Sequence, residues 1–279
     1  MEPRPRSFYI LAAFFSLYVL FLYGPTITIA ILSFQGPNGG LTFPMRGVSL
    51  NWFHELFKQQ AVGDIWGSFS RSLRLGLMVM VTTVVVSVMG GLAFRKKFAG
   101  SGVLFYLAIA GLVIPSILVS LGVGLFFSQA KLPVHWATSG FGAQLTWTLP
   151  FGLLVMFAVF NRFNPAYEEA ARDQGASPWQ TIRHVVLPII APSLMGVALF
   201  GFTLSYDEFA RTLLTSGSRN TLPLEIYGMT TNVTTPVIFA LGTLTTLFSF
   251  AVIGLFLLTV FILNRRRNRA GSDAGKGMV

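Results

Sequence analysis

The sequence predicts an all-α integral membrane protein with six transmembrane helices, and three observations lead to this fold class. Of the 279 residues 53% are hydrophobic and only 11% are charged, whereas an average soluble domain carries about 25% charged residues. The apolar residues gather in six stretches, each long enough to cross a bilayer, which takes about 20 residues. The chain has no Cys, which excludes disulfides, thiolate metal sites and catalytic thiols.

The six apolar stretches are separated by segments that carry charged or turn-forming residues. The first begins after Arg6 and is too long for the apolar region of a signal peptide, about 7–15 residues, so we expect an uncleaved helix. The second ends at the basic triplet 95–97 and the sixth at the triplet 265–267. The expected spans are 8–34, 75–94, 103–130, 141–160, 185–206 and 237–263.

The distribution of charge predicts the orientation in the membrane. The formal net charge is +10 and the pI is about 10.4. In a membrane protein we interpret this excess as Lys and Arg that anchor cytoplasmic loops, and we expect no nucleic-acid partner. Six spans place both termini on one side, where most basic residues lie, although Arg71 and Arg74 lie on the other. We therefore expect a cytoplasmic N-terminus at 1–7, a transmembrane domain at 8–263 and a basic cytoplasmic tail at 264–279.

Catalytic, cofactor-binding and metal-ligating clusters are not expected, and neither is enzymatic activity. His54-Glu55 begins like the zinc motif H-E-x-x-H, but Lys58 occupies the position of the second His. The central parts of the six spans lack Asp, Glu, Lys, Arg and His, which argues against a carrier driven by protons or sodium. A secondary carrier or channel that acts without an ATPase is the alternative to the interpretation below, and an integral membrane enzyme is a weaker one.

The segment between the fourth and fifth expected spans predicts two short, well-capped helices. Asn164 can cap the first helix, with Pro165 at its first position. Gly175 is placed to turn the chain after this helix in the left-handed conformation. Ser177 and Gln180 have the spacing of a capping box at the start of the second helix. Capping alone is compatible with a loop that has no further role.

The same segment carries a pattern that resembles the EAA motif of bacterial ABC importer permeases. That motif reads E-A-A, three residues, G, nine residues, I-x-L-P, and this chain departs from it only by Val185 in place of Ile. The resemblance implies a type I ABC importer permease-like fold, in which this loop is a cytoplasmic coupling helix that docks on the ATPase. We expect Glu169 to brace the coupling helix. The residues that carry the expected ATPase coupling are Glu169, Ala170, Ala171, Gly175, Leu187 and Pro188.

Three further segments are similar to the spermidine/putrescine permease subgroup: 49–53, 205–209 and 222–227. The second of them contains Asp207-Glu208, where the subgroup has an acidic pair after the fifth span. These carboxylates are candidates for the entrance of a cationic solute or for contact with a binding protein. The alternative is a structural role, in which they cap the loop or pair with Arg211.

The resemblance also implies partners, a mechanism and a location. The chain would be one permease subunit of the bacterial cytoplasmic (inner) membrane, paired with a second, non-identical permease, a cytoplasmic ABC ATPase dimer and an extracytoplasmic solute-binding protein. Transport would follow alternating access, driven by closure of the ATPases on ATP. The small-molecule solute expected from the resemblance is a polyamine, while 4-aminobutyrate and opine-like conjugates stay open. No cofactor is expected.

Overall fold

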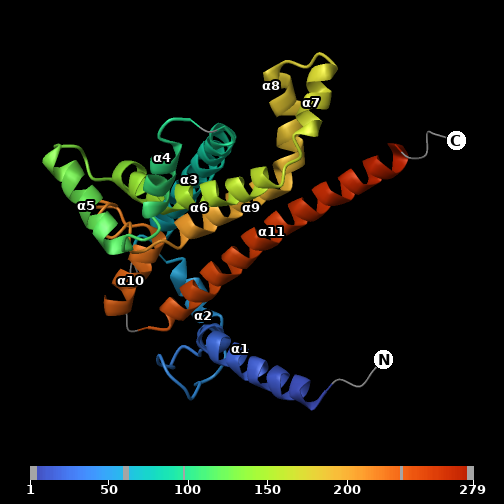
Figure 1. Cartoon of the computed structure of the whole chain (residues 1–279). Helices are drawn as coiled ribbons and strands as arrows, with labels where there is room; N and C mark the ends of the chain where they lie inside the picture. The colour runs from blue at the N-terminus through green and yellow to red at the C-terminus, as the bar shows by residue number, and fades with distance from the viewer. Residues whose placement is uncertain (1–4, 59–62, 97, 233–234, 275–279) are drawn as a thin grey trace. The chain divides into compact units, whose positions relative to one another are not determined.

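A computed structural model describes residues 5–58, 63–96, 98–232 and 235–274 (Figure 1). In these residues the regular structure is helical apart from one isolated β-bridge between Gln35 and Val48, so the predicted all-α class is confirmed. Residues 1–4 of the expected N-terminal segment and 275–279 of the expected tail lie outside the described residues.

Five helical segments in the described residues are long and apolar enough to cross a membrane. α1 (Arg6–Leu32), α3 (Ile65–Phe94) and α11 (Val237–Ala274) each contain one. α6 (Phe141–Asn161) continues the π-helical turn η1 (Trp136–Gly140), and α8 (Pro178–Thr181), η2 (Ile182–Val186) and α9 (Leu187–Tyr206) form one continuous run. The five segments are Ser7–Leu32, Ile65–Phe94, Trp136–Asn161, Pro178–Tyr206 and Val237–Ile262.

The expected third span, 103–130, is divided into two shorter helices. α4 (Ser101–Ala110) and α5 (Ser116–Gln129) are separated by a turn that ends at Pro115. Proline lacks the amide hydrogen that would continue the first helix. At Gly111 a Cβ atom would lie 2.1 Å from the carbonyl oxygen of Thr146 in α6, so this turn approaches its neighbour at a distance that only glycine permits.

Two helices extend beyond the spans expected from the sequence. α3 begins at Ile65, ten residues before the expected start, and so contains Arg71 and Arg74. Arg71 is accommodated because its Nε donates to the carbonyl oxygen of Asn220 at 2.6 Å. α11 continues as a helix to Ala274, whereas its apolar part, Val237–Ile262, matches the expected span 237–263.

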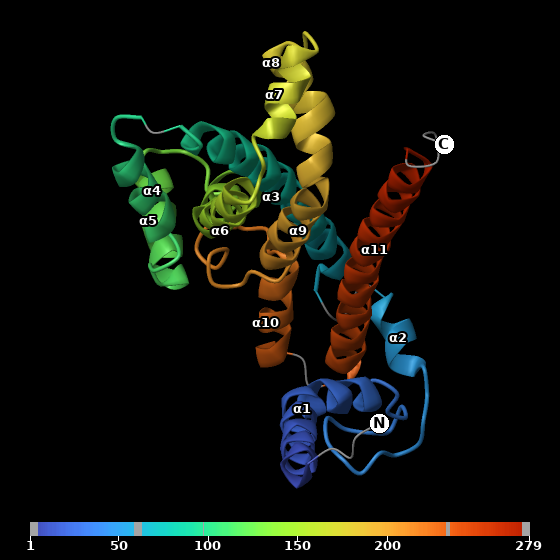
Figure 2. The same cartoon turned by 45° about the vertical axis from the view of Figure 1, so that its right-hand side comes forward.

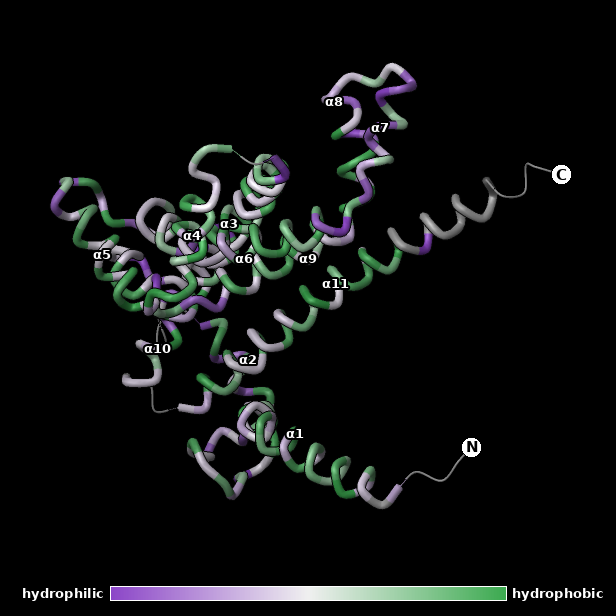
Figure 3. The backbone as a smooth tube through the Cα atoms, in the orientation of Figure 1, coloured by the Kyte–Doolittle hydropathy of each residue, from purple (hydrophilic) through white to green (hydrophobic). Residues whose placement is uncertain are grey.

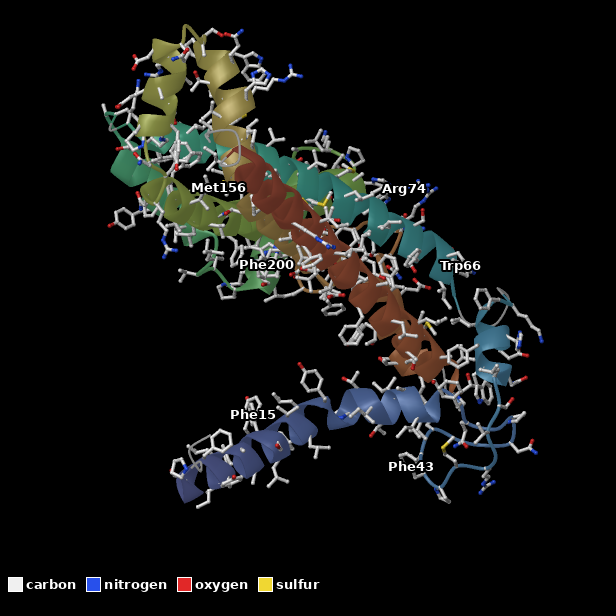
Figure 4. The ribbon with its side chains drawn as sticks, turned by 90° about the vertical axis from the view of Figure 1, so that its right-hand side faces the viewer. Phe15, Phe43, Trp66, Arg74, Met156 and Phe200 are labelled. Atoms are coloured by element: carbon white, nitrogen blue, oxygen red, sulfur yellow. The ribbon has the colours of Figure 1, made fainter. Side chains whose placement is uncertain are left out.

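The chain divides into two compact units, 1–64 with 226–251 and 65–225 with 252–279. In the first unit, α1 exposes apolar side chains on all sides, and Phe15, labelled in Figure 4, is 65% exposed. The loop after α1 is closed around the buried Gln35, whose amide oxygen accepts from the backbone N–H of Arg46 at 2.7 Å. The short helix α2 (Asn51–Leu56) follows this loop. α10 (Leu222–Asn232) and α11 each belong in part to both units.

The core of the second unit lies where α3, α6 and α9 pack side by side (Figures 1 and 2). Leu75 and Val79 of α3 pack on Trp136, just before α6. At the other end Met156 and Phe160 of α6 pack on Val186 and on α9. α3 and α6 are therefore parallel, and α9 runs antiparallel to both. Figure 4 labels Met156, which is fully buried in this core.

Small and polar residues allow these three helices to approach closely. A Cβ at Gly152 would lie 2.2 Å from the Ser87 hydroxyl, and one at Gly91 would lie 2.7 Å from the Phe160 ring. Such small residues are typical of helix contacts in membranes, where backbones pack at short range.

Candidate functional site

The segment 164–181, which we call the α7–α8 hairpin, stands beyond the ends of α6 and α9 (Figures 1 and 2). It contains α7 (Ala166–Asp173) and α8. Hydrophilic residues gather here, whereas α6 and α9 are mainly hydrophobic (Figure 3). The hairpin contains four of the six predicted coupling residues, Glu169, Ala170, Ala171 and Gly175, and the other two, Leu187 and Pro188, begin α9.

Both predicted caps of the hairpin are confirmed. The Asn164 side-chain oxygen accepts from the backbone N–H of Ala166 at 3.0 Å, which satisfies one of the free donors at the start of α7. The Ser177 hydroxyl accepts from the Gln180 N–H at 3.3 Å, and the Gln180 side chain accepts from the Ser177 N–H at 2.8 Å. This reciprocal pair is the predicted capping box.

The turn between the two helices depends on Gly175, whose φ is +82° as predicted. The Gly175 N–H donates to the Arg172 carbonyl at 2.8 Å, and the Ala176 N–H donates to the Ala171 carbonyl at 3.0 Å. These two bonds form a Schellman motif, which closes the end of α7 and reverses the chain. The left-handed conformation at this position favours glycine.

The hairpin continues without a break into α9 through η2. Pro188, at the start of α9, cannot donate to the carbonyl of His184, and its ring would crowd that carbonyl in a regular helix. The wide π turn at 182–186 lies directly before this proline, in keeping with the helical irregularity that proline causes. Leu187 packs against the core cluster of α6 and α9. Leu187 and Pro188 therefore join the hairpin to the core.

Glu168 holds α7 to the end of α3. Its carboxylate forms an ion pair with Arg95, which directly follows α3, and a second, longer pair with Arg172 at 3.6 Å. The Arg95 guanidinium lies 5.3 Å from the ring centre of Phe160 and 5.4 Å from that of Phe163, a geometry in which a cation is attracted by the ring faces. The sequence assigned the bracing role to Glu169, whereas the structure gives these contacts to the preceding Glu168.

The outward face of the hairpin carries two largely exposed aromatic side chains. Tyr167 is 55% exposed and Trp179 is 65% exposed. Glu169 and Ala170 are also exposed. Exposed aromatic side chains of this size are typical of protein interfaces.

The acidic pair at the opposite end of the core lies at the start of the loop 207–221. Glu208 and Arg211 are both buried, with their charged groups 3.6 Å apart, and Glu208 also accepts from the Arg211 N–H at 2.8 Å. Arg211 donates further to Ser116 at 2.7 Å and to Thr146 at 3.3 Å. Its guanidinium lies 4.6 Å from the ring centre of Trp147. Of the two roles left open for Glu208, this geometry favours pairing with Arg211.

Asp207 differs from its neighbour because it is exposed. Partial desolvation raises the pKa of the Asp207 carboxyl above its usual range. Burial lowers the pKa of the Arg211 guanidinium, and the negative charge of Glu208 acts in the opposite direction. Since arginine has a pKa far above neutrality, Arg211 stays charged and compensates Glu208.

Residues that the sequence analysis missed lie inside the three-helix core. Thr83 of α3 donates to Thr148 of α6 at 3.0 Å, and Gln144 of α6 donates to the Ser205 carbonyl of α9 at 3.3 Å. The Ser205 hydroxyl in turn donates to the Gln144 amide oxygen. The sequence signal for these contacts was the presence of polar residues within apolar stretches. Their side chains form hydrogen bonds with one another and with the backbone across the three helices.

Comparison with known proteins gives two kinds of match. The family described as "Binding-protein-dependent transport system inner membrane component" matches residues 83–269. The spermidine/putrescine transport system permease protein PotC of Haemophilus influenzae is 27% identical over 256 residues, covering 88% of this chain and 94% of that protein. The putrescine transport system permease protein PotI of Escherichia coli is 27% identical over 232 residues, covering 80% of this chain and 81% of that protein.

A solved structure shares the fold. It is a bacterial alginate ABC transporter in complex with an alginate pentasaccharide-bound periplasmic protein, and one of its chains aligns with a TM-score of 0.68 at 15% identity. The alignment covers 93% of each chain. At this identity the likeness concerns the fold alone.

Proposed function

The chain belongs to the family of binding-protein-dependent transport system inner membrane components, and from that premise we propose that it carries a polyamine. It is a multi-pass permease subunit of an ABC importer and not an enzyme, because the ATPase of such an importer is a separate chain. The observation that carries the solute proposal is the similarity to PotC and PotI over at least four fifths of the chain. The alginate transporter does not bear on the solute, since it shares the fold at only 15% identity.

The α7–α8 hairpin is, in this proposal, the coupling helix that docks on the ATPase. Three features support the assignment: the capping box and Schellman motif make the hairpin rigid, it projects beyond the ends of α6 and α9, and it exposes Tyr167 and Trp179. Ala170 is small and exposed, which leaves room for the close approach of a second protein. The ion pair to Arg95 and the direct run into α9 join the docking face to the transmembrane core.

Six crossings are proposed, with α4 and α5 together forming the third. α3 and α6 are parallel, since their final residues meet at Arg95 and Phe160, so the chain must return across the membrane between them. α4 and α5 have 10 and 14 helical residues, which together extend about 36 Å at 1.5 Å per residue. A bilayer core is about 30 Å thick. The hairpin then lies in the cytoplasm, as do both termini, with the same boundaries expected from the sequence at 8 and 263.

A second permease is the proposed neighbour of α1 and α11. No residue in the most apolar window of either helix is buried within the described residues, and such surfaces face either lipid or another transmembrane protein. The binding protein is proposed to dock at the opposite end, near the loop 207–221. The alginate transporter, whose fold is shared, is seen with its periplasmic protein.

The solute can be tested by uptake into cells that express the chain with its second permease, ATPase and binding protein. We expect ATP-dependent accumulation of radiolabelled putrescine or spermidine, with 4-aminobutyrate as the competing candidate. Cells that lack only this permease are the matched control. Uptake of 4-aminobutyrate without polyamine uptake would contradict the polyamine proposal, and polyamine uptake without an ATPase would favour a secondary carrier.

A further inference from the structure

α7 is connected to the transmembrane core in two different ways. Along the chain it continues through Gly175 into α8 and η2, against which it also packs. Across space it is joined to α3 by the ion pair between Glu168 and Arg95. The first connection leads to α9 and the second leads to α3, so the hairpin is tied to two helices that pack on each other over much of their length.

The space between α7 and the end of α3 is not filled by packed side chains. A cleft of about 410 Å³ opens there, lined by Leu92, Arg95, Glu168 and Ile182 among others. A cleft of this size removes the close apolar contact that normally holds two helices together. The ion pair between Glu168 and Arg95 therefore spans an open cleft and is not part of a packed interface between α7 and α3.

Arg95 is held in place for this contact by the end of α6. Its guanidinium lies against the rings of Phe160 and Phe163, and its side chain is only 25% exposed. The Glu168 side chain is 13% exposed. Partial burial reduces screening by solvent and salt, so such a pair is stronger than one on the open surface.

We propose that Arg95 and Glu168 are positioning residues that carry the movement of the α7–α8 hairpin to α3, so that α3 and α9 move together. The inference rests on the proposed role of the hairpin as the coupling helix. Displacement of α7 reaches α9 directly through the continuous helix. Without the ion pair, the displacement would reach α3 only indirectly, through the packing of α9 on α3, because the open cleft separates α7 from the end of α3.

The first readout needs no solute. The chain has no Cys, so spin labels can be attached to Ala93→Cys at the end of α3 and Gln174→Cys at the end of α7, both exposed positions. In the assembled transporter we expect the distance between the labels to stay constant when ATP and vanadate are added. Glu168→Gln should make this distance change or broaden, whereas Asp173→Asn, which removes a charge from the same helix, should not.

The second readout is the amount of putrescine taken up per ATP hydrolysed in proteoliposomes that contain the whole transporter. We expect Glu168→Gln and Arg95→Gln each to lower this ratio about fivefold, a usual size for coupling between sites. The double variant should be no worse than either single variant, and Arg95→Lys, which keeps the charge, should lose less. Assembly with the ATPase, followed by gel filtration, should be unchanged in all variants.

Two results would overturn the proposal: a constant label distance in Glu168→Gln, or effects of the two single variants that multiply in the double variant. Gly175→Val separates this failure from that of the coupling-helix assignment. If Gly175→Val lowers the uptake ratio and Glu168→Gln does not, only the link to α3 is wrong. If neither variant lowers it, the coupling-helix assignment fails as well, and the proposal with it.

Discussion

The two ends of the three-helix core each carry a Glu–Arg pair, and the surroundings of the two pairs differ. At the loop 207–221, Glu208 and Arg211 are buried and Arg211 has further partners on α5 and α6. At the hairpin, Glu168 and Arg95 bridge an open cleft and remain partly accessible. The first arrangement fixes a loop against its helices, whereas the second links two elements that can still move. The difference indicates that the end of the core at the loop 207–221 is rigid, whereas the end at the hairpin allows movement.

The loop end is further fixed by hydrogen bonds to several elements. The Ser139 hydroxyl donates to the Thr215 carbonyl at 2.7 Å, and the Leu222 N–H donates to the Ser72 hydroxyl at 2.8 Å. The Leu214 N–H donates to Ser120 at 2.9 Å. A loop attached to η1, α3 and α5 in this way needs a larger disturbance to move than the hairpin does.

Removal of Arg211 should have the largest effect. Arg211→Ala leaves the buried carboxylate of Glu208 without its partner, and breaking a buried pair in this way costs about 3–5 kcal/mol. We expect a marked fall in the melting temperature of the purified protein and little assembled complex. Arg219→Ala, at an exposed position of the same loop, is the control. A melting temperature equal to that of the wild type would show that the loop is not held by this pair.

Gly175→Val should be the next most harmful change. The position has φ +82° and open space around its missing Cβ, so the cost is conformational, about 2 kcal/mol for a residue forced into this region. We expect uptake to fall about tenfold or more while the protein stays in the membrane. Gly196→Val adds the same side chain to α9 at a position that also has open space, and it should transport normally. Equal uptake by the two variants would contradict the role of the turn.

Ser177→Ala should have a moderate effect on the hairpin. It removes the side-chain half of the capping box, and the loss of such a cap costs about 1 kcal/mol. Hydrogen exchange should become faster at the backbone amides of α8 and leave α6 unaffected. Exchange in α8 at the wild-type rate would mean that the capping box does not stabilise the hairpin.

Asp207→Asn should have the smallest effect, on the half-saturating concentration for a cationic solute. An exposed carboxylate contributes at most about 1 kcal/mol, so we expect a rise of about fivefold or less at low salt that disappears at high salt. Uptake should be measured at both ionic strengths, with the assembled amount checked in parallel. A half-saturating concentration that matches the wild type at low salt would exclude Asp207 from the entrance.

The local features of the hairpin could be predicted because each depends on residues close in sequence. The caps at Asn164 and Ser177 and the turn at Gly175 involve partners within a few residues, and all three are confirmed. The i,i+4 pair of Glu168 and Arg172 had the same kind of signal. The EAA motif, in contrast, emphasises Glu169.

The remaining features depend on distant parts of the chain and could not be predicted. The contacts of Arg211 with Ser116 and Thr146 cross 95 and 65 residues. From the sequence, Arg95 is only one of three consecutive basic residues that indicate orientation. Its partner Glu168 could not be identified because it lies 73 residues away. Hydropathy found the third apolar stretch but not its division, because the turn at Gly111 is shaped by the approach of Thr146.

Cross-linking from Ala170 tests most directly the claim that the hairpin docks on the ATPase. Because the chain has no Cys, Ala170→Cys and Leu213→Cys each introduce a single reactive thiol, one on the hairpin and one on the exposed part of the loop 207–221. With a short bifunctional reagent in intact membranes, Ala170→Cys should cross-link to the ATPase and Leu213→Cys should not. Labelling of Ala170→Cys by a membrane-impermeant thiol reagent added to whole cells, with no cross-link to the ATPase, would contradict the account.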